Sequence, residues 1–153
     1  MGVFLDGLHA DSATTIPVGE IAPETARLLK VTQECLAAGI DAAKLGNHVG
    51  DIGHAVQQVA EAAGFGVVRE LVGHGIGTQF HEEPQVPNHG QPKRGPRLTE
   101  GMTIAIEPMI TMGHYATRTL PDRWTVVTTD GSLSAHFEHT VAIGQNGARV
   151  LTA

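Results

Sequence analysis

Cysteine is almost absent from this sequence, because Cys35 is the only one among 153 residues. One cysteine cannot build a disulfide framework, so a reducing cytoplasm is the expected setting. Cys35 stands in an alanine-rich stretch and is expected to be a small core residue. The opening MGVFLDGLHAD has neither the basic start nor the apolar run of a signal peptide, and no later segment approaches a membrane span. We therefore expect a soluble cytoplasmic protein that makes no membrane contact.

Basic and aromatic residues are also few. Ten Lys and Arg stand against sixteen Asp and Glu, and the net charge of −6 comes without a basic stripe, so nucleic acid is not an expected partner. A hydrophobic fraction of 41% with 17% charged residues excludes wholesale disorder, and the length fits one domain over residues 1–153. Nine histidines and nineteen glycines are many for this length, which permits metal chemistry without proving it.

The first half of the chain predicts a hairpin followed by two helices. VFL, the turn DG and LHADSATTIPVG are typical of a β-hairpin that begins at residue 3. Apolar residues recur at helical spacing over residues 22–44, with Pro23 in the first turn. Asp51 is the expected cap of a second helix that ends at Gly64.

The second half predicts strands. Residues 88–97, NHGQPKRGPR, are expected to form an exposed loop. Four β-rich runs follow it, namely MTIAIEPMI, WTVVTTD, SAHFEHTVAIG and ARVL. This order of elements indicates an α+β fold in which two helices cover an antiparallel sheet.

Four residues near strands or sharp turns have metal-binding side chains: Asp11, His74, Glu107 and Glu138. Glu107 ends an apolar strand, where a carboxylate is costly to bury without a cation or a donor. One imidazole with three carboxylates suits Mn, Fe, Co or Zn, and a cation offsets the repulsion between the acids. Taken singly, each acid is more typical of a turn or surface position, and His74 of a polar loop or a satisfied core histidine.

Other catalytic motifs do not fit. HEEPQ lacks the second histidine of the helical zinc-protease motif, and Pro84 prevents a helix there. GHGIG has the wrong glycine spacing for a dinucleotide fingerprint. Nucleophilic triads have little support, because no serine stands between the glycines of a strand-to-helix elbow.

Taken together, HADSATTIPVG, GHGIGTQFHEEPQVPN, EGMTIAIEPMI and WTVVTTDGSLSAHFEHTVAI resemble the successive signature blocks of type I methionine aminopeptidases. The resemblance covers nearly the whole chain. It implies half of a pita-bread fold, with a curved antiparallel sheet covered by two helices, and a metal-dependent aminopeptidase that removes the amino-terminal methionine from peptides or nascent proteins. The family uses two divalent metal ions, Co, Mn, Fe or Zn.

The resemblance also implies roles for single residues. Asp11 and Glu138 match carboxylates that bridge two metals, and His74 and Glu107 match terminal ligands. His81 matches a catalytic histidine that faces the substrate and stabilises its oxyanion, while Glu107 can also accept a proton from the attacking water. Trp124 matches a residue beside the substrate pocket, although core packing is an equal alternative.

The chain departs from the family pattern at its start. A further aspartate that precedes the counterpart of Asp11 in the family falls before Met1, as does an upstream catalytic histidine. The chain thus resembles the carboxy-terminal half of a catalytic domain, and we expect weak binding of one metal, a low or absent activity when isolated, and either self-association or pairing with a missing amino-terminal half.

A second functional class stays open at this stage. The chain can also be a noncatalytic, pita-bread-like module that binds peptides or proteins. The four metal-competent residues argue against it, because such a module has no physical need for them. Among the other histidines, His9 and His139 are expected to lie nearest the site, since each neighbours a candidate ligand, and His136 is expected to be structural or superficial.

Overall fold

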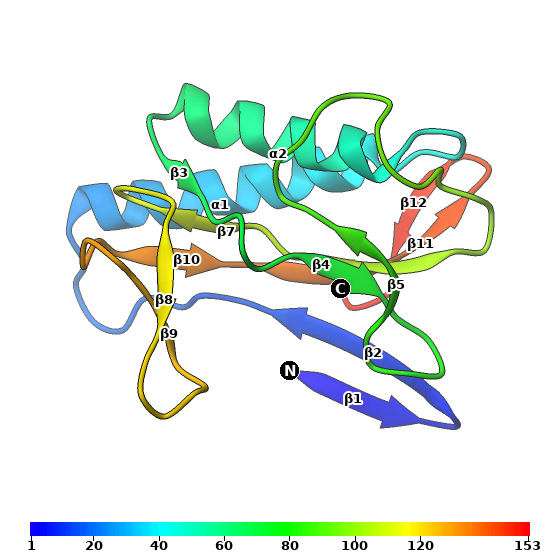
Figure 1. Ribbon diagram of the computed structural model, residues 1–153, viewed down its shortest axis with the longest axis horizontal. Coiled ribbons are helices and arrows are strands. Elements are labelled where there is room, and N and C mark those ends of the chain that lie inside the picture. The colour runs from blue at the N-terminus through cyan, green and yellow to red at the C-terminus, as the bar shows by residue number, and fades with distance from the viewer.

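A seven-stranded antiparallel sheet forms the centre of the computed structural model, which describes all 153 residues (Figure 1). Six strands follow one another in the order β1-β2-β11-β6-β4-β5, and β12 pairs with β11. The strands are β1 (Gly2–Leu5), β2 (Leu8–Ala13), β4 (Gly73–Gly75), β5 (Glu82–Val86), β6 (Thr103–Ile106), β11 (Glu138–Gly144) and β12 (Gly147–Val150). Because neighbours in the sheet come from distant parts of the sequence, residues from both halves of the chain meet on one surface.

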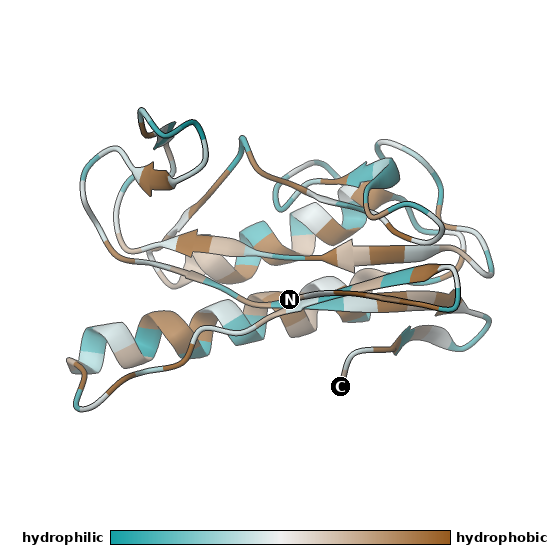
Figure 2. Ribbon diagram, turned by 90° about the horizontal axis from the view of Figure 1, so that it is seen from below, coloured by the Kyte–Doolittle hydropathy of each residue, from teal (hydrophilic) through white to brown (hydrophobic).

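The predicted hairpin is present as β1 and β2. Asp6 and Gly7 connect the strands with φ angles of 50° and 84°, the left-handed conformations that a two-residue hairpin turn requires. β1 is the edge of the sheet, and Val3, Phe4 and Leu5 are exposed on it. In Figure 2, which views the molecule from below, this hairpin lies in front of the sheet. The hairpin therefore leaves both an unpaired strand edge and apolar side chains open to solvent.

Both predicted helices are present, at slightly different positions. α1 spans Pro23–Ala42 and starts with proline, whose fixed φ suits the first helical turn. α2 spans Val49–Ala62 and begins three residues earlier than expected. Asp51 is therefore not the capping residue, which is His48, but its carboxylate reaches back and accepts the His48 N–H at 2.7 Å.

The hydrophobic core lies between the helices and one face of the main sheet. Twenty buried residues form a single cluster that joins α1 and α2 to the strands. Ile104 and Ile106 of β6 and Val141 and Ile143 of β11 face the helices, so the residues between them face the opposite side. Cys35 is completely buried in this core, and burial raises the pKa of its thiol to about 12, as expected of a packing residue. Neither helix is long and apolar enough to cross a membrane.

Two of the predicted β runs are each divided between two sheets. One breaks at Glu107 and Pro108, and the other breaks at Phe137, whose ring is buried in the core. As a result β7 (Met109–Thr111) and β10 (Ser134–His136) join β3 (Gly66–Val67) in a three-stranded sheet. A third sheet pairs β8 (Thr117–Thr119) with β9 (Val126–Thr128), of which only β9 lies in a predicted β run. This small sheet projects away from the main sheet in both views (Figures 1 and 2).

The segment 88–97 is a loop, but the expectation that all of it is exposed is wrong. Asn88 is buried and its side-chain amide donates to the backbone oxygen of Glu107 at 3.0 Å. The Lys93 N–H donates to Asp51 at the start of α2. Polar side chains made the segment resemble solvent-exposed sequence, whereas in the fold Asn88 supplies a donor that a buried carbonyl requires.

Candidate metal centre

Four adjacent strands bring the predicted ligands to the sheet face opposite the helices. In the order β2-β11-β6-β4, the strands carry Asp11, Glu138, Glu107 directly after β6, and His74. Glu138 pairs with Ala13 of β2, while the next residue on β11 pairs with Ile106 of β6. The register therefore sets Glu138 beside Glu107, and the alternation of side chains turns both away from the core.

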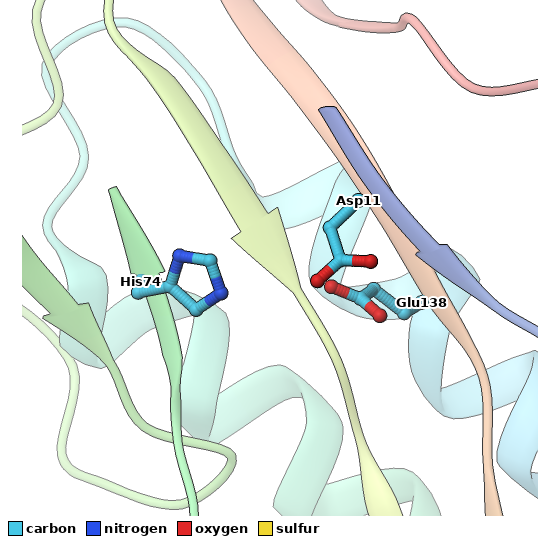
Figure 3. Close-up of side chains that lie close together, drawn as sticks. All are labelled: Asp11, His74 and Glu138. Atoms are coloured by element: carbon cyan, nitrogen blue, oxygen red, sulfur yellow. The ribbon is translucent and has the colours of Figure 1, made fainter. Parts of the chain in front are cut away.

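Three of the four residues converge closely. One ligand atom each from Asp11, His74 and Glu138 lies within 4.8 Å of the other two. Figure 3 shows the two carboxylates next to each other, with the His74 ring across from them on a different strand. Asp11 is further fixed by Thr140 of β11, which accepts from the Asp11 N–H at 2.9 Å and donates to its carbonyl oxygen at 2.8 Å.

Glu107 is the fourth residue and stands slightly apart. It does not belong to the group of three, but its Oε1 lies 3.6 Å from His74 Nε2. Its backbone oxygen is held by Asn88, as described above. The structure thus brings all four predicted residues to one place, with Glu107 beside the His74 end of the cluster.

The His74 ring is held with one nitrogen facing the site. Its Nδ1 lies 2.9 Å from the carbonyl oxygen of Gly75, so Nδ1 carries the proton that this acceptor needs, and the Nε2 lone pair points toward the carboxylates. The flanking glycines are required by close backbone approach. A Cβ at Gly73 would lie 2.3 Å from the Ala105 carbonyl oxygen, and one at Gly75 would lie 2.2 Å from that of Glu83.

The acids in the cluster are destabilised in their charged form. Burial, and then repulsion from Glu138 and Asp11, raises the pKa of Glu107 to about 8. Burial, and then repulsion from Asp11, raises the pKa of Glu138 to about 7. Burial lowers the pKa of His74, which favours its neutral form. The site therefore holds more acceptors than the protein can satisfy by itself.

These residues fit a divalent metal ion. The Glu138 Oε1 atom is buried and has no hydrogen-bond partner, and the His74 Nε2 lone pair lies 3.6 Å from the Glu107 carboxyl group, too far for a hydrogen bond. A cation placed among them satisfies the lone pairs and removes the repulsion. Carboxylates with imidazole form the ligand set expected for Mn, Fe, Co or Zn.

The cluster opens into a cavity of about 1150 Å³ whose wall also contains His81 and Trp124. The His81 ring lies edge-on to that of His74, with 4.3 Å between ring centroids, and its side chain is exposed to the cavity. Trp124 is 87% exposed at the end of the β8–β9 connection, so core packing is excluded for it. Their roles toward a substrate stay predictions.

One residue of the site was not expected from the sequence. His136 lines the cavity, and its Nε2 lies 3.7 Å from Glu107 Oε2, whereas His9 and His139 line no part of this cavity. His139 instead contacts the Thr152 hydroxyl. For His139 proximity in sequence was a poor guide because adjacent residues of a strand point to opposite faces. His9 shares a face with Asp11 but lies further along the hairpin, against the Phe4 and Phe80 rings. His136 stands two residues before Glu138, on the other side of the buried Phe137, and this spacing puts both side chains on the cavity side.

Curated methionine aminopeptidases match this chain over almost its whole length. The chain is 52% identical over 151 residues to a methionine aminopeptidase of Clostridium acetobutylicum. This match covers 99% of the chain and 60% of the relative. It is 51% identical over 152 residues to methionine aminopeptidase 1 of Bacillus subtilis, and this match covers 99% of the chain and 61% of the relative. The chain therefore spans about 60% of the length of the curated relatives that it matches.

Solved structures agree. The crystal structure of the methionine aminopeptidase from Rickettsia prowazekii matches with a TM-score of 0.97 at 42% identity, over 99% of this chain and 62% of that one. The prolidase from Pyrococcus furiosus shares the fold, with 24% identity and a TM-score of 0.74. That match covers 99% of this chain and 39% of the prolidase chain. The predicted α+β, pita-bread type of fold is thus confirmed. Because residues 1–145 match the family model as well, the chain belongs to metallopeptidase family M24.

Proposed function

We propose that this chain carries the metal centre of an aminopeptidase that removes methionine from the amino terminus of peptides or nascent proteins. The observation that supports this most directly is the convergence of Asp11, His74 and Glu138, with Glu107 beside them, at the wall of an open cavity. Relatives at about half identity are named methionine aminopeptidases, which supports the same substrate class. A cytoplasmic location stays a prediction of the sequence.

The residues of the cavity divide into two tasks. Asp11, His74, Glu107 and Glu138 hold a divalent ion, which when bound polarises a carbonyl and lowers the pKa of water. His81, exposed beside His74, donates a hydrogen bond to the oxygen of the scissile amide as negative charge develops there. Glu107, beside His74 at the edge of the cluster, accepts the proton of the attacking water. A noncatalytic binding module has no use for buried acceptors that lack partners.

Release of methionine from a Met-Ala-Ser peptide tests the proposal. The 153-residue chain is assayed with Mn²⁺ or Co²⁺ under anaerobic conditions, alone and mixed with the segment of the Bacillus subtilis relative that this chain does not match. We expect little or no release from the chain alone and metal-dependent release from the mixture, and we expect Glu138→Ala to abolish it, since one of the converging carboxylates is then missing. Methionine release that persists without metal, or in Glu138→Ala, would contradict the proposal.

His81→Ala separates substrate chemistry from metal binding. We expect the rate of peptide hydrolysis to fall on the order of 100- to 1000-fold, because one donor to the developing oxyanion is lost. Affinity for Co²⁺ stays within a few fold of the unmodified chain, since His81 is not among the ligands. His114→Ala, which removes another exposed histidine, is the matched control and leaves both values unchanged. A large loss of Co²⁺ affinity in His81→Ala would assign the residue to the metal instead.

We also propose that the β1–β2 hairpin is an interaction surface. Its outer strand edge is unpaired, and Phe4, Leu5 and Leu8 are more than half exposed on it. We expect the 153-residue chain to form a dimer or larger species in light scattering, because unpaired strand edges and apolar patches associate. Leu5→Lys restores a monomer, while Leu151→Lys, at an exposed leucine outside the hairpin, does not. If the unmodified chain is monomeric at every concentration, the proposal that the hairpin mediates self-association is wrong.

A further inference from the structure

The carboxylate of Glu107 lies between two imidazoles. Its Oε1 is 3.6 Å from His74 Nε2, and its Oε2 is 3.7 Å from His136 Nε2. The Nε2 atom of His136 is buried and has no hydrogen-bond partner, although part of the ring reaches the cavity. His74 presents a lone pair, because its proton is held at Nδ1 by the Gly75 carbonyl. Of the two imidazoles, His136 is the one free to donate a proton to Glu107.

The main chain of His136 is fixed in place. The Thr15 hydroxyl donates to the His136 carbonyl oxygen at 2.7 Å and accepts from its N–H at 3.0 Å. His136 also pairs with Met109 across β10 and β7, and Met109 follows Glu107 by only two residues. Strand pairing and Thr15 thus set the separation between the His136 ring and the Glu107 carboxylate. Such a ring can orient a carboxylate, since its own position is fixed by the backbone.

We propose that His136 is a positioning residue for Glu107: its Nε2–H holds the outer carboxylate oxygen, Oε2, so that Oε1 stays directed at His74 and the metal. At 3.7 Å the contact is too long for a direct hydrogen bond and is completed by one water or by a small rotation of the ring. His136 is not itself a ligand, because it lies outside the group of atoms that converge at Asp11, His74 and Glu138.

Nuclear magnetic resonance of the metal-free chain tests the first half of the inference. Long-range ¹H–¹⁵N spectra of the histidine rings report which nitrogen carries the proton. We expect His136 to be protonated at Nε2 and its Nε2 resonance to move in Glu107→Gln, while the His139 resonances stay in place. An Nδ1–H tautomer at His136, or no response to Glu107→Gln, overturns the proposal. This readout needs no metal.

Co²⁺ titration tests the second half, which rests on the metal centre of the proposed function. His136→Ala is expected to weaken Co²⁺ binding on the order of 10- to 100-fold, as loss of a group that orients a ligand does. His136→Gln restores most of the affinity, because its amide N–H reaches the same oxygen, and it leaves the visible Co²⁺ spectrum unchanged. His139→Ala, a matched histidine three residues away that contacts Thr152, has no effect.

The outcomes separate the two proposals. Affinity in His136→Ala equal to that of the unmodified chain overturns the positioning role. If His136→Gln binds Co²⁺ as weakly as His136→Ala and the Co²⁺ spectrum changes, His136 is a direct ligand. That result also overturns the positioning role. If the unmodified chain binds no Co²⁺ in calorimetry, the proposed metal centre fails, while the tautomer of His136 and its response to Glu107→Gln still decide the contact with Glu107.

Discussion

Replacing Glu138 by glutamine is expected to weaken Mn²⁺ or Co²⁺ binding on the order of 100-fold or more, because a converging carboxylate becomes a neutral amide. The same substitution is expected to stabilise the metal-free chain near pH 8. Glu138 is 4% exposed, its Oε1 has no partner, and burial raises its pKa to about 7, so its ionised form is costly in the fold. The site is thus built at the expense of stability.

The size of the stabilisation follows from the pKa. A rise from 4.5 to about 7 disfavours the charged side chain in the native state, and we expect a gain of about 2 kcal/mol in Glu138→Gln after allowance for the new amide. For a chain of this length that is roughly 4–8 °C in melting temperature. Calorimetric scans with chelator and titrations with Co²⁺ measure the two effects.

Glu20→Gln is the matched control, because Glu20 is an exposed acid in the segment before α1. It should change neither the melting temperature nor the metal affinity. If Glu138→Gln keeps its affinity for Co²⁺, Glu138 is not a ligand. If it instead lowers the melting temperature of the metal-free chain, the buried carboxylate has a partner in solution that stabilises it.

Metal binding is expected to depend steeply on pH. The folded-state pKa values of Glu107 and Glu138 are raised to about 8 and about 7, so both side chains bind protons that a metal must displace. Burial lowers the pKa of His74, so this ligand is already neutral and does not oppose binding. Between about pH 6 and pH 8 we expect Mn²⁺ affinity to rise on the order of 100-fold or more, with release of protons.

The sign for stability is opposite in the metal-free chain. An acid whose pKa is raised on folding contributes stability that is fully present below its unfolded value of 4.5, and that is lost as the pH rises through 7 and then 8. The metal-free chain should therefore melt at lower temperature as pH rises over this window, and stabilisation by Mn²⁺ should grow. Titrations in buffers with different heats of ionisation count the protons released. An affinity that is flat with pH would show that the two acids are already ionised.

Much of the site could be predicted from the sequence, and the reason is local. Several features can be recognised within a few neighbouring residues. These are the glycines around His74, the strand that ends before Glu107 and Pro108, and the DG turn before Asp11. Resemblance of those segments to one family supplied their order. The two helices followed from apolar spacing, to within three residues at the start of α2.

Other features were decided only in three dimensions. Asn88 belongs to a polar segment, yet the fold buries it because the Glu107 carbonyl needs a donor. For Trp124 the sequence left core packing and a place beside the pocket as equal alternatives, but the β8–β9 connection holds it in solvent. His136 was expected to be structural or on the surface. It reaches Glu107 only because its strand, β10, is separated from β11 at Phe137 and pairs with β7.

The sequence alone therefore determined which side chains are capable of holding a cation, since ligand chemistry is a property of each residue type. The tertiary structure decided how near they come and how they are protonated. Strand order and register place Asp11, Glu138, Glu107 and His74 on four neighbouring strands of one face. Burial on that face then moves the pKa values, because removal of water raises the free energy of every unpaired charge.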